Sequence, residues 1–290
     1  MYMEYNQVIS QEHRGLFIIT IDQSGSMLEP FSNHSMIVSK SDIAAMIASG
    51  IIEELVLHTK QAFRLSDPCP YCDICVLGYS KLDVASLLPG GALILPITAL
   101  NCEQPPITNR TIEYIDNQNR LQLVTESYRE WITPKATNIT PTEDMLNTIT
   151  TIVNEWCHNV SNRDSMPPIV FNISDGVGYQ EYRHQYLELT DKIKSIGTNH
   201  GKTLLFNICV EPCRNNNPLL FPNPDDLPAN HFLAPFVQMS SLLPEQFYPL
   251  AEKYNPNAKP PYLSFSYNAI AMQILPMLNI VVKWDNWEFI

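Results

Sequence analysis

The chain of 290 residues has few basic residues and no long hydrophobic run. Its 18 Lys and Arg stand against 30 Asp and Glu, which gives a net charge of −12. This charge repels phosphate backbones and anionic lipid, so we expect neither nucleic acid nor membrane among the partners. No apolar stretch approaches the ~18 residues of a membrane span, and residues 1–15 lack the basic start and apolar centre of a secretory signal. We therefore expect a cytoplasmic protein.

The seven cysteines do not indicate a disulfide framework, because an odd number spread through a long chain is typical of a reducing compartment. Cys69-Pro-Tyr-Cys72 spells a redox dithiol, but such a motif needs a helix at its first cysteine to lower the thiol pKa. Residues 73–79 instead have the pattern of a strand. A zinc site that included Cys75 would lack a fourth ligand. We favour buried small hydrophobic residues, with redox or zinc chemistry as the alternatives.

Apolar strand patterns alternate with helical ones along most of the chain. The expected strands cover residues 16–22, 72–79, 168–174 and 203–210, and the expected helices cover residues 39–61, 141–160, 179–198 and 244–254. This order predicts an α/β fold with a doubly wound, mostly parallel, Rossmann-like sheet and helices on both faces. Hydrophobic residues make up 45% of the chain, which suffices for a large core.

We interpret residues 1–290 as a single domain, because the sequence contains no internal repeat. Segments rich in Asn and Pro near residues 99–120 and 213–235 are expected to be loop insertions. A C-terminal extension is expected from about residue 256.

Two smaller features complete the expected fold. Pro89-Gly-Gly91 lies between apolar runs within residues 85–95 and predicts a hairpin or an edge strand. A further helix is expected over residues 120–131, closed by Pro134.

Three separated segments place oxygen-bearing side chains where a strand ends or a helix begins. Asp22, Ser24 and Ser26 follow the first strand, Asp175 follows a later strand, and Thr140 precedes a helix. Ligands of open α/β sheets bind at the carboxyl ends of the strands, so these side chains are expected at one edge. Carboxylates and hydroxyls suit Mg²⁺, Mn²⁺ or Ca²⁺, because hard cations select oxygen donors.

Each segment also has a simpler interpretation. Thr140 is suited to cap the following helix, with Pro141 at the first helical position and Glu143 completing a capping box. Asp175 and Gly176 fit a plain turn, and the two serines fit hydrogen bonding within a loop. Their joint occurrence in this order favours the metal site.

These segments resemble the metal-ion-dependent adhesion site of the von Willebrand factor A (vWA) family. That site is built from DxSxS, then a Thr, then an Asp, and the matching sequences here are Asp22-Gln-Ser-Gly-Ser26, Asn138-Ile-Thr-Pro-Thr142 and Ile173-Ser-Asp-Gly176. Residues 239–247 are similar to the final helix of many bacterial vWA domains. The resemblance covers residue 15 to about residue 255.

The resemblance implies that Ser24, Ser26 and Thr140 are hydroxyl ligands of Mg²⁺, Mn²⁺ or Ca²⁺. Asp22 and Asp175 would bind mostly through water or order the surrounding groups. In the family, one open metal position accepts an Asp or Glu of a protein partner. The family has two glycines before the threonine, whereas here Asn138 and Ile139 occupy those places.

The bacterial vWA proteins that this chain resembles most are associated with tellurite resistance and stress response. They accompany kinases, phosphatases or ATPases as adaptors. The resemblance therefore implies a cytoplasmic adaptor in a stress or defence system.

Two other functions remain as alternatives to a binding module. In a Mg²⁺-dependent phosphatase of the haloacid dehalogenase type, Asp22 would be the nucleophile, and a second Asp two residues later would be the general acid. Ser24 stands at that place. Because the motifs supply no acid or base, we do not expect an enzyme. The other alternative is a structural subunit with a non-functional metal site, whose segments 99–119 and 213–235 make the contacts.

Overall fold

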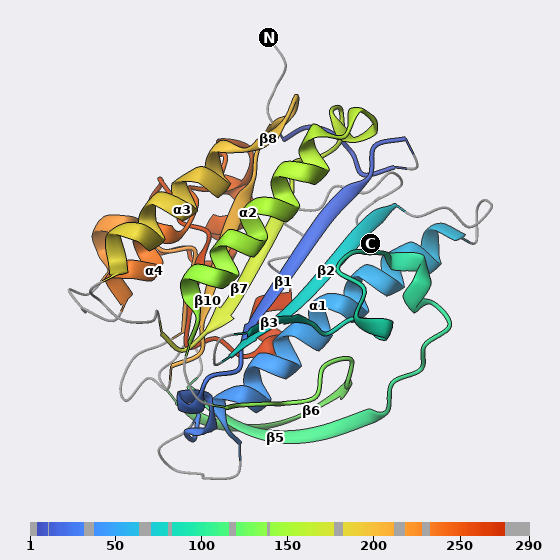
Figure 1. Cartoon of the computed structure of the whole chain (residues 1–290). Coiled ribbons are helices and arrows are strands. Elements are labelled where there is room, and N and C mark those ends of the chain that lie inside the picture. The colour runs from blue at the N-terminus through green and yellow to red at the C-terminus, as the bar shows by residue number, and fades with distance from the viewer. Residues whose placement is uncertain are drawn as a thin grey trace.

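The computed structural model describes residues 5–10, 12–31, 38–63, 71–80, 83–115, 120–137, 140–176, 182–211, 218–227 and 233–275. Within these ranges, an eight-stranded sheet carries helices on both faces (Figure 1). Most of its strand pairs at the centre are parallel. The predicted doubly wound α/β class is therefore confirmed.

Four parallel strands form the centre of the sheet. In spatial order they are β2 (Cys72–Ser80), β1 (Gly15–Asp22), β7 (Ile169–Ser174) and β10 (Leu204–Cys209). Strands β1 and β7 are buried along their whole length, which explains their uninterrupted apolar sequence. Because the strands are parallel, the loops that follow β1, β7 and β10 meet at the same edge.

Short strands extend the sheet on both sides. They are β3 (Asp83–Ser86) and β4 (Leu95–Pro96), both antiparallel to β2, and β12 (Phe265–Tyr267) and β11 (Leu219–Leu220) beyond β10. The predicted edge strand around Pro89 is thus confirmed by β3 and β4. A separate pair is formed by β8 (Gly197–Thr198) and β9 (Gly201–Lys202).

The helices cover the two faces of the sheet. They are α1 (Lys40–Phe63), α2 (Thr142–His158), α3 (Arg183–Ser195), α4 (Leu233–Met239) and α5 (Tyr248–Tyr254), with 3₁₀ turns η1 (Gly25–Leu28), η2 (Pro89–Gly91), η3 (Ile97–Leu100), η4 (Val160–Asn162), η6 (Pro224–Asp226) and η7 (Glu245–Phe247). Helix α1 packs with Phe17 and Ile19 on one face, whereas α2 and α3 pack with Leu16 and Ile18 on the other (Figure 1). No helix in the described ranges is long and apolar enough to cross a membrane.

Residues 107–115 and 121–129 form an antiparallel pair of strands, here called the hairpin, which the sequence did not predict. Strands β5 (Ile107–Ile115) and β6 (Leu121–Arg129) pair with each other along nine residues. The expected loop near 99–120 is therefore wrong where β5 lies, whereas residues 101–106 are irregular as expected, and the expected helix over 120–131 is wrong. Along β6, exposed and half-buried residues alternate with the period of two that belongs to a strand.

The hairpin lies against α1 on the side away from the main sheet (Figure 1). Ile112 is buried in the same core as α1. Arg110 forms an ion pair of 3.3 Å with Asp42, and the indole N–H of Trp131 donates to Glu53 over 2.7 Å. The insertion is thus attached to a helix and does not extend the sheet.

The C-terminal third contributes more to the sheet than expected. The segment 213–235 was predicted to be irregular, yet β11 and the start of α4 lie in its described part. Residues 239–247 are not one helix, because α4 ends at Met239 and η7 begins at Glu245. Between them, the N–H of Ser241 donates to the carbonyl of Leu205, which holds this segment against β10.

Candidate metal centre

Four of the five predicted ligands meet at the carboxyl edge of the sheet. Asp22 ends β1, Ser24 and Ser26 lie in the following loop and η1, and Asp175 follows β7. The hydroxyl oxygens of Ser24 and Ser26 are 3.1 Å apart, and Ser26 donates a hydrogen bond of 3.0 Å to Asp175 Oδ1. Ser26 is exposed, so the cluster reaches solvent.

Asp22 lies beneath the exposed serine, in the interior, and holds the surrounding groups in place through hydrogen bonds. It is fully buried; its Oδ1 accepts a hydrogen bond from the N–H of Ser24 over 2.8 Å, and its Oδ2 accepts one from Ser174 Oγ over 2.6 Å. Burial raises the pKa of Asp22 to about 6; the bond from Ser174 lowers it, the charge of Asp175 raises it and the bonds from Ser24 lower it. Both carboxylate oxygens are thus engaged within the protein.

Ser174 is a residue that the sequence reasoning missed. Its hydroxyl links the end of β7 to the end of β1 through the bond to Asp22. The signal was present, because Ser174 stands directly before Asp175 in the motif that identified the site.

All five predicted ligands are described residues. Among them, the side chain of Thr140 forms no hydrogen bond with the other four. It is half-buried and precedes α2, whose N-cap is Pro141 without a side-chain hydrogen bond, so the predicted capping role is wrong. The chain just before it does reach the site, because the N–H of Thr137 donates to the carbonyl of Gln23 over 2.5 Å. Asn138 and Ile139 lie outside the described residues. Ligation by Thr140 stays a prediction.

A buried lysine lies on the other side of Asp175. Lys40 begins α1, and its ammonium donates to Glu29 over 2.8 Å, to Asp175 Oδ2 over 2.9 Å and to Glu211 over 2.7 Å. Its side chain is 1% exposed. Glu29 follows η1, and Glu211 lies two residues beyond β10. None of Lys40, Glu29 and Glu211 was predicted from the sequence.

This ammonium is positively charged. Burial lowers the pKa of Lys40, but the hydrogen bonds to Glu211, Glu29 and Asp175 outweigh it and raise the pKa above its ordinary value. For Glu211, burial raises the pKa of the carboxyl and the bond from Lys40 lowers it. Three carboxylates around one ammonium leave the neighbourhood of the hydroxyls negative overall.

A chain of buried polar side chains joins the central strands just before the site. Asn172 Oδ1 accepts hydrogen bonds of 3.0 Å from the hydroxyls of Thr20 and Tyr79, and its amide donates to Asn207 over 2.8 Å. These residues belong to β7, β1, β2 and β10. Fully satisfied buried networks fix the relative positions of the elements that they join, and here they fix the strands that carry the site.

The residues present fit a hard divalent cation. Ser24, Ser26, Asp22 and Asp175 offer only oxygen, which Mg²⁺, Mn²⁺ and Ca²⁺ prefer, and they come from two loops that are already in contact. The cysteines do not compete for this role. Cys72 and Cys75 are buried in β2, and burial raises the pKa of Cys75 to about 12. Cys69 lies outside the described residues.

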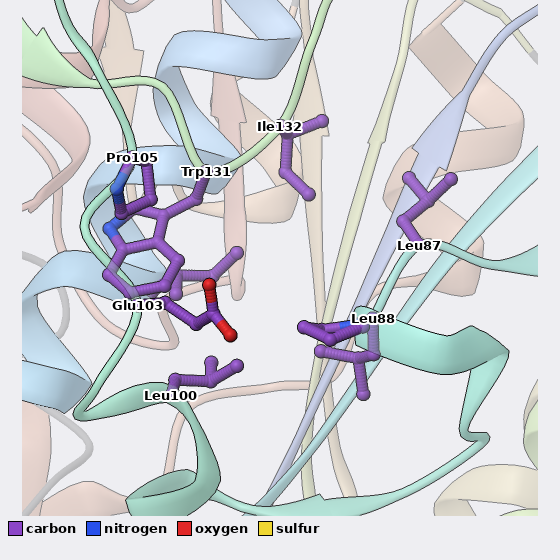
Figure 2. A pocket seen from close by; sticks show the side chains of 9 residues that line it. Leu87, Leu88, Leu100, Glu103, Pro105, Trp131 and Ile132 are labelled. Carbon is purple, nitrogen blue, oxygen red and sulfur yellow. The ribbon is translucent and has the colours of Figure 1, made fainter.

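A separate cavity of about 220 Å³ lies beside α1 (Figure 2). Ile52, Leu88, Leu100 and Trp131 are among its lining residues, and the carboxylate of Glu103 points toward its centre. Ile52 is twelve residues from Lys40 on α1, or roughly 18 Å along the helix axis. The cavity is smaller than the ~300–1,000 Å³ that is usual for ligand pockets, so the oxygen cluster is the stronger candidate site.

No family model matches the sequence, and no curated protein matches it. Among solved structures, the chain is similar to an aerotolerance-related membrane protein from Bacteroides fragilis NCTC 9343 with multiple mutations to serines, at 11% sequence identity and a TM-score of 0.33. The match covers 67% of this chain and 66% of that chain, so it spans less than two thirds of that protein's length. A likeness at this level does not assign a family.

Proposed function

We propose that this protein is a binding module that holds a divalent cation at Asp22, Ser24, Ser26 and Asp175, with Thr140 completing the set. Through the ion it captures an Asp or Glu of a protein partner. The observation that supports this most is the hydrogen-bonded cluster of Ser24, Ser26 and Asp175, which brings together residues from two strand ends.

The chemistry of the donors favours capture of an acid. Hydroxyl ligands are neutral, so the ion keeps most of its positive charge, and a partner's carboxylate supplies a strong bond. The oxygens of Asp22 are already bonded within the protein, which suits ordering of the serine loop better than tight direct ligation. We favour Mg²⁺, and Mn²⁺ and Ca²⁺ fit the same donors.

Binding is favoured over hydrolysis by the state of the nearest candidate base. Lys40 is protonated and bonded to three carboxylates, so it is not free to take up a proton. The partner class follows only from the vWA resemblance, which suggests a kinase, phosphatase or ATPase of a bacterial stress system.

Terbium luminescence tests both halves of this proposal, because the lifetimes in H₂O and D₂O report how many waters the bound ion retains. We expect Tb³⁺ to bind the wild type and to lose one water when a short peptide containing Asp is added. The same peptide with Asn in place of Asp should leave the water count unchanged. Ser24→Ala should weaken ion binding by at least about 10–100-fold.

Ser161→Ala is the matched control, because Ser161 is exposed and lies in η4, before the amino end of β7, whereas Asp175 follows the carboxyl end of that strand. It should bind the ion like the wild type. Equal affinities of Ser24→Ala and the wild type for Tb³⁺ would contradict the proposed ligand set. If the Asp peptide does not change the number of waters on the bound ion, the proposed capture of an acidic residue is contradicted.

A further inference from the structure

Asp175 lies between two clusters of oxygen atoms. Its Oδ1 accepts from Ser26 on the hydroxyl side, and its Oδ2 accepts from Lys40 on the acidic side. On the acidic side, ligand atoms of Glu29, Asp175 and Glu211 lie within 4.8 Å of one another, a spacing at which three carboxylates can hold a metal ion. Oxygen ligands thus converge at two adjacent places at this edge of the sheet, one on each side of Asp175.

The acidic side already contains a cation. The Lys40 ammonium is 2.7–2.9 Å from one oxygen of each carboxylate, and an ammonium has three hydrogens to donate. A positive charge at the beginning of a helix is opposed by the helix dipole, and burial of the ammonium costs free energy as well. The three carboxylates are what stabilises Lys40 at this place.

The backbone holds the ammonium there as well. The N–H of Lys40 donates to the carbonyl of Glu29 over 3.0 Å, and Pro30 and Ser39 form an antiparallel bridge beside it. The segments that contribute carboxylates follow η1, β7 and β10. One side chain thus connects three loops at the edge where the hydroxyls lie.

We propose that Lys40 is a built-in cation that closes the acidic cluster to metal ions and directs the divalent cation to the hydroxyl side of Asp175. Lys40 acts as a positioning residue, because its hold on Oδ2 keeps Oδ1 toward Ser26. This deepens the proposed function and rests on it for the identity of the hydroxyl site. The closure of the acidic cluster can be tested by itself.

The test is the number of Mn²⁺ ions bound per chain, measured by equilibrium dialysis with elemental analysis. Lys40→Met removes the charge and keeps much of the side-chain volume. We expect Lys40→Met to bind one ion more than the wild type, and Lys40→Met/Glu211→Gln to lose that additional ion. A folded Lys40→Met protein that binds the same number as the wild type would overturn the proposal.

Lys40→Met has three uncompensated carboxylates and can fail to fold without metal. In that case Mn²⁺ is expected to refold it, because an ion that binds only the native state stabilises that state, and absence of refolding would overturn the proposal. In the wild-type background, Glu211→Gln should still bind the same number of ions. Loss of the ion in Glu211→Gln would show that the acidic cluster is the metal site.

The additional ion also separates the two proposals. If the wild type binds no Mn²⁺ and Lys40→Met binds one, the proposed function fails and the closure by Lys40 stands. If Ser24→Ala loses the ion but Lys40→Met gains none, the closure fails and the proposed function stands.

Discussion

The two sides of Asp175 differ in what neutralises them. The hydroxyl side has two serines and solvent contact, whereas the acidic side has two further carboxylates and an internal ammonium. A count of carboxylates alone would assign a metal to the acidic side. The comparison shows that a metal site is defined by the charge still uncompensated as much as by the number of acidic ligands.

Removal of the Lys40 ammonium should have the largest effect of the changes considered on either side of Asp175. In EDTA, we expect Lys40→Met to lower the free energy of unfolding by about 3–5 kcal/mol, because it leaves the buried Asp175 carboxylate without its oppositely charged partner. Glu29 and Glu211 add little, since their side chains are 65% and 34% exposed. Urea unfolding measures the loss.

Lys192→Met is the matched control, because Lys192 is exposed on α3. Its effect should stay within about 0.5 kcal/mol. If Lys40→Met were no less stable than Lys192→Met, Lys40 would not hold the carboxylates together.

A smaller effect is expected on the hydroxyl side. Ser174→Ala removes the bond of 2.6 Å to Asp22 Oδ2 and leaves the serine ligands in place. Removal of a group that orients a ligand typically costs 10–100-fold in metal affinity, and we expect a loss of about this size in a Mn²⁺ titration. Ser165→Ala is the control, because the buried hydroxyl of Ser165 has no hydrogen-bond partner in the described part of the chain. Equal affinity in the two variants would exclude an orienting role for Ser174.

The central strands could be predicted from the sequence, because burial on both faces is the one physical cause of their continuous apolar pattern. The apolar runs before Asp22 and Asp175 are strands buried on both faces, and their carboxyl ends meet because the strands are parallel. The contact between Ser26 and Asp175, 149 residues apart, follows from this topology.

The hairpin shows why a periodic pattern can mislead. Leu121, Val124 and Tyr128 are spaced like one face of a helix, yet they belong to strand β6. Leu121 and Leu123 are 54% and 69% exposed, so apolar residues lie on both faces of the strand and hide its period of two. Packing against α1, which the local sequence does not report, determines the strand.

The role of Lys40 could not be recognised from the sequence either, and the reason differs from that for the hairpin. Its three partners lie 11, 135 and 171 residues away, on loops that meet only once the sheet has formed. A lysine in the first turn of a helix has many ordinary explanations on an exposed surface. Its burial among carboxylates is a property of the tertiary structure alone.

The most direct measurement is anomalous diffraction from crystals of the wild-type protein soaked in Mn²⁺. We predict one peak at the carboxyl edge of the sheet, within about 2–2.6 Å of the hydroxyl oxygens of Ser24 and Ser26, with Lys40 still bonded to Glu29, Asp175 and Glu211. A peak between Glu29 and Glu211, with the ammonium displaced, would contradict the assignment of the metal to the hydroxyl side.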